Sequence, residues 1–178
     1  HACVLHWTRN DGPVYQGDLM LIDAGIEVDS FYTADITRTL PISGKFSPAQ
    51  RALYMLVYES QLAGFAAVKP GAVFSDINKA CQAVLAKGLA DMGVLTVSAE
   101  ESLLPEVGLH RRWTLHGVSH HLGLDVHDCA KARKENYTDA ILREGMVITV
   151  EPGLYIQPDD ELFTPEYRGI GIRIEDDV

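Results

Sequence analysis

The stretch HGVSHHLGLDVHD, residues 116–128, carries four of the seven histidines of this chain. Imidazole is the commonest neutral metal ligand and the usual proton carrier near neutral pH, so this density indicates a metal site or acid–base chemistry. The stretch also contains the residues Leu122, Gly123, Leu124 and Val126, which are typical of a buried segment, so we expect it to be buried. Buried histidines need partners, which must be carboxylates or a metal ion. The alternative is a solvated, histidine-rich turn.

An excess of acidic residues restricts the partners that this chain can bind. Its 178 residues include 15 Lys and Arg against 25 Asp and Glu, which gives a formal net charge of −10. This charge argues against nucleic acids and anionic membrane surfaces as partners. The hydrophobic content of 47% is that of an ordinary globular protein, and the length suits one domain with a sizeable core.

Cysteine usage and the apolar runs favour a cytoplasmic location. Cys3, Cys81 and Cys129 cannot form a closed set of disulfides, which fits a reducing compartment. No uninterrupted apolar run approaches the length of a membrane span. The first residue is His1, and Val178 falls within a strand pattern, so we expect the chain to be a fragment of a longer protein.

Hydrophobic patterning predicts one α/β domain of the α+β type over residues 1–178. A capping hydroxyl at Ser47 and a proline at Pro48 mark the start of the first helix. The second and third strands are expected to pair as an antiparallel hairpin. The expected strands cover 1–7, 18–28, 31–42, 145–150 and 169–178, and the expected helices cover 47–69, 75–93 and, within a surface segment without chemistry, 98–104.

Four carboxylates lie within or directly after apolar strand patterns. Asp23 and Asp35 are on the two arms of the hairpin, and the apolar run 19–22 predicts that the first arm is buried on both faces. Glu151 and Glu175 each end an apolar strand pattern. A buried carboxylate is costly unless its charge is compensated, so these positions favour a bound cation. The alternative is that backbone amides compensate each one.

These carboxylates and one histidine form a candidate ligand set, namely Asp23, Asp35, His120, Glu151 and Glu175. Four carboxylates and one imidazole suit two hard or borderline divalent ions such as manganese, cobalt or zinc. Two such ions about 3.5–4 Å apart can share and deprotonate one water and stabilise the oxyanion of a tetrahedral intermediate. The set therefore favours a hydrolase.

Five motifs follow one another along essentially the whole chain. They are Asp-Ala-Gly at 23–25, Ala-Asp-Ile-Thr-Arg-Thr at 34–39, the histidine stretch at 116–128, Thr-Val-Glu-Pro-Gly-Leu-Tyr at 149–155 and Gly-Ile-Arg-Ile-Glu-Asp-Asp at 171–177. These motifs resemble those of the proline-specific metallopeptidases, and within that group the Xaa-Pro aminopeptidases (aminopeptidase P). The resemblance implies the pita-bread fold, a curved antiparallel sheet covered by helices. It also implies release of the N-terminal residue from peptides with proline at the second position.

The resemblance implies a role for each candidate ligand, with manganese as the first expectation and cobalt or zinc as alternatives. Asp23 would chelate one ion, and Asp35 and Glu175 would bridge both. His120 and Glu151 would complete the second ion. Glu151 would also take a proton from the bridging hydroxide and pass it to the leaving proline nitrogen.

Further residues match the substrate side of that family's site. His116 and His127 match two histidines that face the substrate, and His127 would donate to the carbonyl oxygen and the intermediate. His6 matches a histidine that lines the proline side. Arg173 matches an arginine that orients the bridging carboxylates, and Tyr155 matches a residue that supports the ligands.

Three alternatives stay open beside this interpretation. Prolidase, which cleaves Xaa-Pro dipeptides, uses the same ligands, whereas methionine aminopeptidase lacks the motif at 116–128. A pita-bread protein that binds peptides without catalysis is disfavoured because all five ligands are present. The resemblance also implies a homo-oligomer, dimer or tetramer, for the full-length protein, and an N-terminal domain that is absent here. His121 is outside the motif positions and is expected to be a partly exposed neighbour.

Overall fold

The predicted hairpin forms the first sheet of the structure, with shorter arms than expected. In the computed structural model, which describes residues 1–178, β1 (Leu19–Ala24) pairs antiparallel with β2 (Ile36–Pro41). The glycine of the Asp-Ala-Gly motif is required just beyond β1, since a Cβ on Gly25 would lie 1.7 Å from the carbonyl oxygen of Ala34. The two arms therefore approach each other most closely beside the predicted site.

Only one face of this hairpin is covered, so the prediction that its first arm is buried on both faces is wrong. Met20 and Ile22 are 38% and 43% exposed. On the covered face of β2 lie Thr37 and Thr39, both fully buried. Their hydroxyl groups bond to the last strands of the chain, so threonine rather than an aliphatic residue fills this face.

The final strand pattern is split into two short strands where the site forms. β5 (Gly171–Arg173) pairs with β4 (Gly153–Tyr155), and β6 (Asp176–Asp177) pairs with β3 (Thr149–Val150). Pro152, between β3 and β4, has no N–H to donate to a partner strand. The ladder is interrupted there, and the expected single strands over 145–150 and 169–178 are correspondingly shorter.

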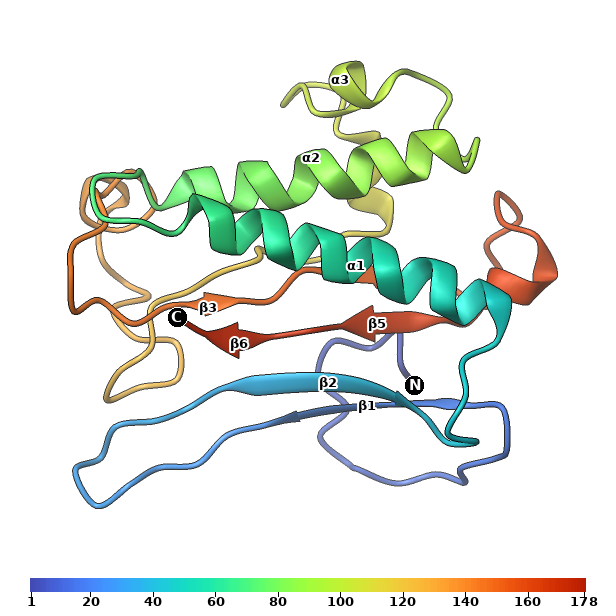
Figure 1. Cartoon of the computed structure of the whole chain (residues 1–178), viewed down its shortest axis with the longest axis horizontal. Coiled ribbons are helices and arrows are strands. Elements are labelled where there is room, and N and C mark those ends of the chain that lie inside the picture. Colours follow the sequence, from blue (N-terminus) through green and yellow to red (C-terminus); the bar gives the residue numbers. More distant parts are fainter.

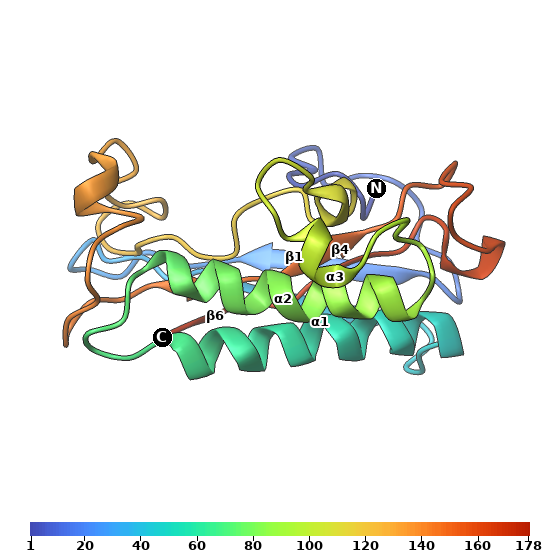
Figure 2. The same ribbon diagram turned by 90° about the horizontal axis from the view of Figure 1, so that it is seen from above.

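Two long helices pack together along one side of these strands. In Figure 1 they lie above β3, β5 and β6, with the hairpin below, and Figure 2 shows them side by side. Ser47 and Gln50 close a capping box at the start of the first helix, as expected for the Ser47-Pro48 sequence. These helices are α1 (Pro48–Ala67) and α2 (Ser75–Asp91).

The main core lies between these helices and the strands. It joins leucines of α1 and α2 to Trp113, Leu154 and Ile172, all almost fully buried. A smaller cluster includes Phe74, Val118 and Ile148. None of the helices combines the length and apolar character that crossing a membrane requires. The remaining helices are short: α3 (Ala99–Ser102) and 3-10 turns at Leu109–Arg112, Lys134–Asn136 and Pro165–Tyr167.

Two further expectations are corrected. Residues 1–7 form turns instead of a strand; the segment is held by the Cys3 thiol, which donates to the carbonyl of Ile156 at 3.1 Å, and by a His1–Trp7 ring stack. Residues 96–112 are not wholly a surface segment, because Ser102 and His110 are buried and bonded to each other. The short helix expected there is present.

Gln61 on α1 should contribute strongly to stability, because its buried amide bonds to two strands. Its Nε2 donates to the carbonyl oxygen of Val150 at 3.2 Å and to Asp176 Oδ2 at 3.0 Å. Gln61→Leu leaves both acceptors without this donor and should lower the free energy of unfolding by about 1–3 kcal/mol, measured by urea denaturation. Gln82→Leu is the matched control, because the Oε1 of Gln82 is buried without a partner. Equal effects of the two variants would contradict this role.

Candidate metal centre

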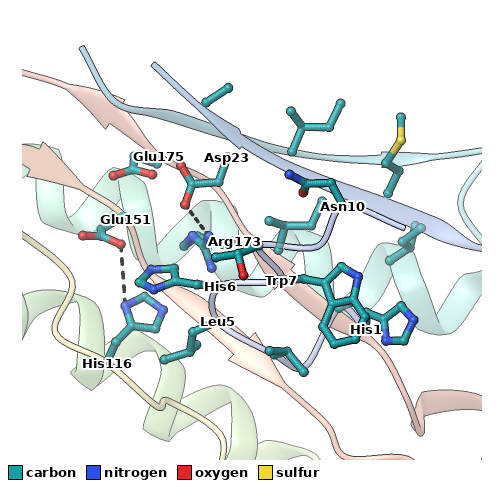
Figure 3. A pocket seen from close by; sticks show the side chains of 18 of the residues that line it. His1, Leu5, His6, Trp7, Asn10, Asp23, His116, Glu151, Arg173 and Glu175 are labelled. Carbon is teal, nitrogen blue, oxygen red and sulfur yellow. Dashed lines mark hydrogen bonds and ion pairs between the residues drawn. The ribbon is translucent and has the colours of Figure 1, made fainter. Parts of the chain in front are cut away.

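A large cleft opens between the N-terminal segment, the hairpin and the histidine stretch. Its volume is about 1510 Å³. Figure 3 shows charged and imidazole side chains gathered at one end of it. The predicted site residues that line the cleft are His6, Asp23, Asp35, His116, His120, His127, Glu151, Arg173 and Glu175.

Three of the predicted ligands converge most closely. One ligand atom each of Asp35, His120 and Glu175 lies within 4.8 Å of the others. The His120 Nε2 is 3.5 Å from Asp35 Oδ2 and 3.4 Å from Glu151 Oε1. Glu151 therefore borders the same group. These four residues come from the end of the hairpin, the histidine stretch and the two sides of the interrupted ladder, regions far apart in the sequence.

The orientation of His120 suits a metal ligand. Its Nδ1 lies 3.0 Å from the carbonyl oxygen of His121. A carbonyl can only accept, so Nδ1 carries a proton, and in the neutral ring the lone pair of Nε2 faces the carboxylates. Metal-binding histidines commonly fix their tautomer in this way.

Two carboxylates of the group, those of Glu151 and Glu175, are protonated more readily than isolated ones, whereas that of Asp35 is not. Burial raises the pKa of Glu151 to about 7. Burial and the charge of Glu151 raise the pKa of Glu175 to about 8. The hydrogen bond with His120 lowers the pKa of Asp35. Burial would lower the pKa of His120, but the neighbouring carboxylates outweigh it and raise the value to about 9. The raised pKa values of His120 and of the two glutamates therefore favour protons, or a bound cation, within the group.

One buried oxygen supports a cation at this place. Glu175 is 1% exposed, and its Oε2 accepts the Thr37 hydroxyl at 2.6 Å. Its Oε1 is also buried and has no hydrogen-bond partner. An orphaned carboxylate oxygen beside the Asp35 and His120 ligand atoms fits a divalent ion well.

Asp23 is placed differently from the other candidate ligands. Its Oδ2 lies 2.6 Å from the Nη2 of Arg173, which is buried. Figure 3 shows this ion pair within the cleft. The arginine also donates from Nε to Thr37, whose hydroxyl bonds to Glu175. Arg173 therefore holds Asp23 directly and Glu175 through one threonine, whereas the sequence interpretation had it orient the bridging carboxylates.

A hydrogen-bonded chain connects Arg173 to His116. The Nη1 of Arg173 donates to the hydroxyl oxygen of Tyr155 at 2.9 Å, and that hydroxyl lies 2.7 Å from the Nε2 of His116. The His116 Nδ1 faces the carbonyl oxygen of Gly117 at 2.7 Å and Glu151 Oε2 at 3.6 Å. Burial and the charge of Arg173 lower the pKa of His116, which favours the neutral form of its ring.

The other histidines differ in exposure. His127 and His6 are exposed at the cleft, and the His127 ring stands perpendicular to that of His120 with centroids 4.5 Å apart. His121 is half-buried and stacks on Phe74 outside the cleft. Within the histidine stretch Leu122 and Gly123 are buried as predicted, whereas Leu124 and Val126 are exposed, which corrects the expectation for these two.

Sequence reasoning missed two residues that support the group. Thr37 links Arg173 to Glu175, and Asp177 Oδ2 accepts the backbone N–H of Asp35 at 3.2 Å. Alternation along a strand gives a signal for both, because Thr37 is two residues from Asp35 and Asp177 two residues from Glu175.

Comparison with known proteins places this geometry in a family. The family model of metallopeptidase family M24 matches residues 1–178. Xaa-Pro aminopeptidase 1 of Streptomyces coelicolor is 59% identical over the whole chain, and the Xaa-Pro aminopeptidase of Escherichia coli is 44% identical. The solved structure of Pseudomonas aeruginosa aminopeptidase PepP aligns with 99% of the chain at a TM-score of 0.92 and 43% identity.

These proteins are much longer than the chain. It spans 36% of the Streptomyces relative, 39% of the Escherichia relative and 39% of the Pseudomonas structure. The fold expected from the motifs is confirmed, since solved aminopeptidase P structures superimpose on nearly all of the chain. With a family match over its full length, the chain belongs to metallopeptidase family M24.

Proposed function

We propose that the protein containing this chain is a metalloaminopeptidase that releases the N-terminal residue from peptides with proline at the second position. The observation that carries the proposal is the convergence of Asp35, His120 and Glu175, with Glu151 beside them, in an open cleft. The names of the relatives, Xaa-Pro aminopeptidases, support the substrate class. We further propose a homo-oligomer in the cytoplasm.

Five residues would hold two divalent ions, with manganese as the first choice: Asp23, Asp35, His120, Glu151 and Glu175. Bound ions of this kind supply a water that is deprotonated near neutral pH. Manganese prefers oxygen ligands to thiolates, and this set offers carboxylate oxygens and a single imidazole. The ion pair between Asp23 and Arg173 would hold that carboxylate beside the group.

Glu151 would act as the proton carrier of the reaction. One of its carboxylate oxygens faces His120 and the other faces His116, so it lies between the ligands and the open cleft. A general base works best when its pKa lies near the working pH, and burial raises the pKa of Glu151 to about 7. It would take the proton of the attacking water and deliver it to the leaving proline nitrogen.

The histidines at the cleft would bind and polarise the substrate. His127 is exposed beside His120, where its ring can donate to the reacting carbonyl oxygen. The neutral ring of His116 is fixed by Tyr155 and Gly117. His6 lies next to these groups in Figure 3 and would line the proline side.

The cleft has room for a peptide longer than a dipeptide, and substrate assays separate this proposal from prolidase activity. A volume of about 1510 Å³ exceeds the usual range of small-molecule pockets. The experiment that tests the function is hydrolysis of a Xaa-Pro tripeptide, a Xaa-Pro dipeptide and an Ala-Ala tripeptide by the manganese-loaded protein. Turnover of the dipeptide alone would indicate prolidase activity, and no turnover would indicate a binding module.

Metal stoichiometry tests the ligand set directly. After removal of metal by chelation and reconstitution with manganese, elemental analysis should find two ions per chain, because five ligands exceed the need of one ion that keeps a water. Glu175→Ala should lower this number, since it removes the orphaned oxygen. One ion or none in the parent protein would contradict the dinuclear proposal.

Two histidine variants should separate metal binding from substrate binding. His120→Ala should lose metal, because it removes the Nε2 that faces Asp35 and Glu151. His127→Ala should keep its metal and lower kcat/KM by about 10²–10³-fold, the usual effect of removing one donor to an oxyanion. Metal content and kinetics are measured on the same samples. Equal loss of metal in both variants would refute this division of roles.

The proton carrier is tested by Glu151→Gln, which keeps the shape of the side chain. We expect kcat to fall by about 10²–10⁴-fold with a small change in KM, because general acid–base catalysis acts on the chemical step. Steady-state kinetics with a Xaa-Pro peptide measure both parameters, and metal content is checked in parallel. An unchanged kcat would exclude Glu151 from proton transfer.

A further inference from the structure

The backbone of His121 fixes the orientation of His120. Its carbonyl oxygen accepts the Nδ1 proton of His120 at 3.0 Å and the backbone N–H of Asp128 at 2.9 Å. This single oxygen therefore sets both the tautomer of His120 and the direction of its Nε2. Any rotation of the His121 backbone would turn the His120 ring away from the carboxylates.

The N–H of His121 is held by a side chain from another loop. It donates to the hydroxyl oxygen of Tyr137 at 3.1 Å. Tyr137 follows the 3-10 turn at Lys134–Asn136, in a loop to which the sequence interpretation gave no role. Residues on either side of His121 use other acceptors: His120 N–H donates to Thr149 Oγ1, and Leu122 N–H donates to the carbonyl of Val147.

Two neighbouring aromatic rings keep the Tyr137 hydroxyl in place. Tyr137 packs edge-on against His121 with centroids 4.9 Å apart and against Phe74 at 5.3 Å. Phe74 and His121 stack at 4.9 Å. Phe74 belongs to the smaller buried cluster, and Tyr137 packs against that cluster. The hydroxyl is thus held in position because the Tyr137 ring packs against this buried cluster.

We propose that Tyr137 is a positioning residue for the metal ligand His120. It does not line the cleft, so it touches neither the ions nor the substrate and acts only through the His121 backbone. Its hydroxyl fixes the N–H of His121, and the same residue's carbonyl fixes the His120 ring. The inference rests on the proposed metalloaminopeptidase function, because the direction of the His120 Nε2 matters only when this atom binds a metal ion.

This role differs from that of an ordinary loop anchor. An anchor would stabilise the loop 131–139 without altering metal affinity. A positioning residue changes the affinity, because removing its hydroxyl leaves the His121 N–H without its partner and loosens the backbone that holds the His120 ring. Outer partners of metal ligands commonly influence metal affinity in this way.

The test is Tyr137→Phe, which keeps the ring and its packing and removes the hydroxyl. Tyr54→Phe is the matched control: Tyr54 also packs against an aromatic ring, that of Phe46, and is outside the cleft lining. Manganese dissociation constants come from competition with a chelator. We expect Tyr137→Phe to weaken manganese binding about 2- to 10-fold, the equivalent of one ordinary hydrogen bond, and the control to leave it unchanged.

A second readout does not depend on metal. In ¹⁵N-labelled protein freed of metal, the Nδ1–H signal of His120 should exchange faster with water in Tyr137→Phe than in the parent or in Tyr54→Phe. At saturating manganese, kcat and KM of Tyr137→Phe should return to within about twofold of the parent, because the effect lies in metal affinity.

Unchanged manganese affinity together with an unchanged Nδ1–H signal would overturn the inference, even if the variant melts at a lower temperature. A parent protein that binds no manganese would instead overturn the proposed function. The Nδ1–H signal would then still show whether Tyr137 positions the His120 ring, so the two failures are distinguishable.

Discussion

The gathering of several carboxylates around one imidazole is the constraint on which this structure depends. Burial raises the pKa of Glu151 and Glu175, neighbouring carboxylates raise it further, and the hydrogen bond with His120 lowers the pKa of Asp35. Such a group is stable only where fixed positive charge and hydrogen-bond donors oppose the repulsion. Arg173, itself buried, is the cation that the fold places there.

The C-terminal strands and the hairpin together bring these groups to the cleft. Pro152 cannot donate, so at this point the ladder keeps only the bond from the N–H of Ile174 to the carbonyl of Pro152. The N–H of the next residue, Glu175, points to the other side of its strand and donates to the carbonyl of Thr37 in the hairpin. This bond joins the C-terminal strands to the hairpin, and Glu151 and Glu175 both line the cleft beside that junction.

Local patterns predicted much of this arrangement. The hairpin, the two long helices and the Ser47 cap follow from periodicity and capping chemistry, which act over a few residues. Burial could not be predicted in the same way. The run at 19–22 has the composition of a strand covered on both faces, yet Met20 and Ile22 are exposed, because coverage depends on which distant segments pack there.

In the site, too, the sequence predicts which types of residue are present but not how they are placed. Sequence could identify Asp23 and Asp35 as charged residues in strand patterns, but not that their environments differ. Asp23 lies within the ladder opposite Thr37 and is held by Arg173, whereas Asp35 lies just before β2 and is held through its backbone by Asp177. Strand alternation places Thr37 and Asp177 two residues from a predicted ligand, but their partners lie more than 130 residues away, and alternation does not identify those partners.

This difference bears on how the two aspartates would share metal ions. An aspartate clamped by a buried arginine has one oxygen committed to that ion pair, so it has less freedom to bridge. Asp35 is free of such a clamp, and its Oδ2 already faces His120. In the proposed arrangement Asp35 and Glu175 would bridge the two ions, and Asp23 would bind one of them. In this arrangement Arg173 determines the direction of Asp23, and the pairing of β1 with β2 determines its distance from Asp35.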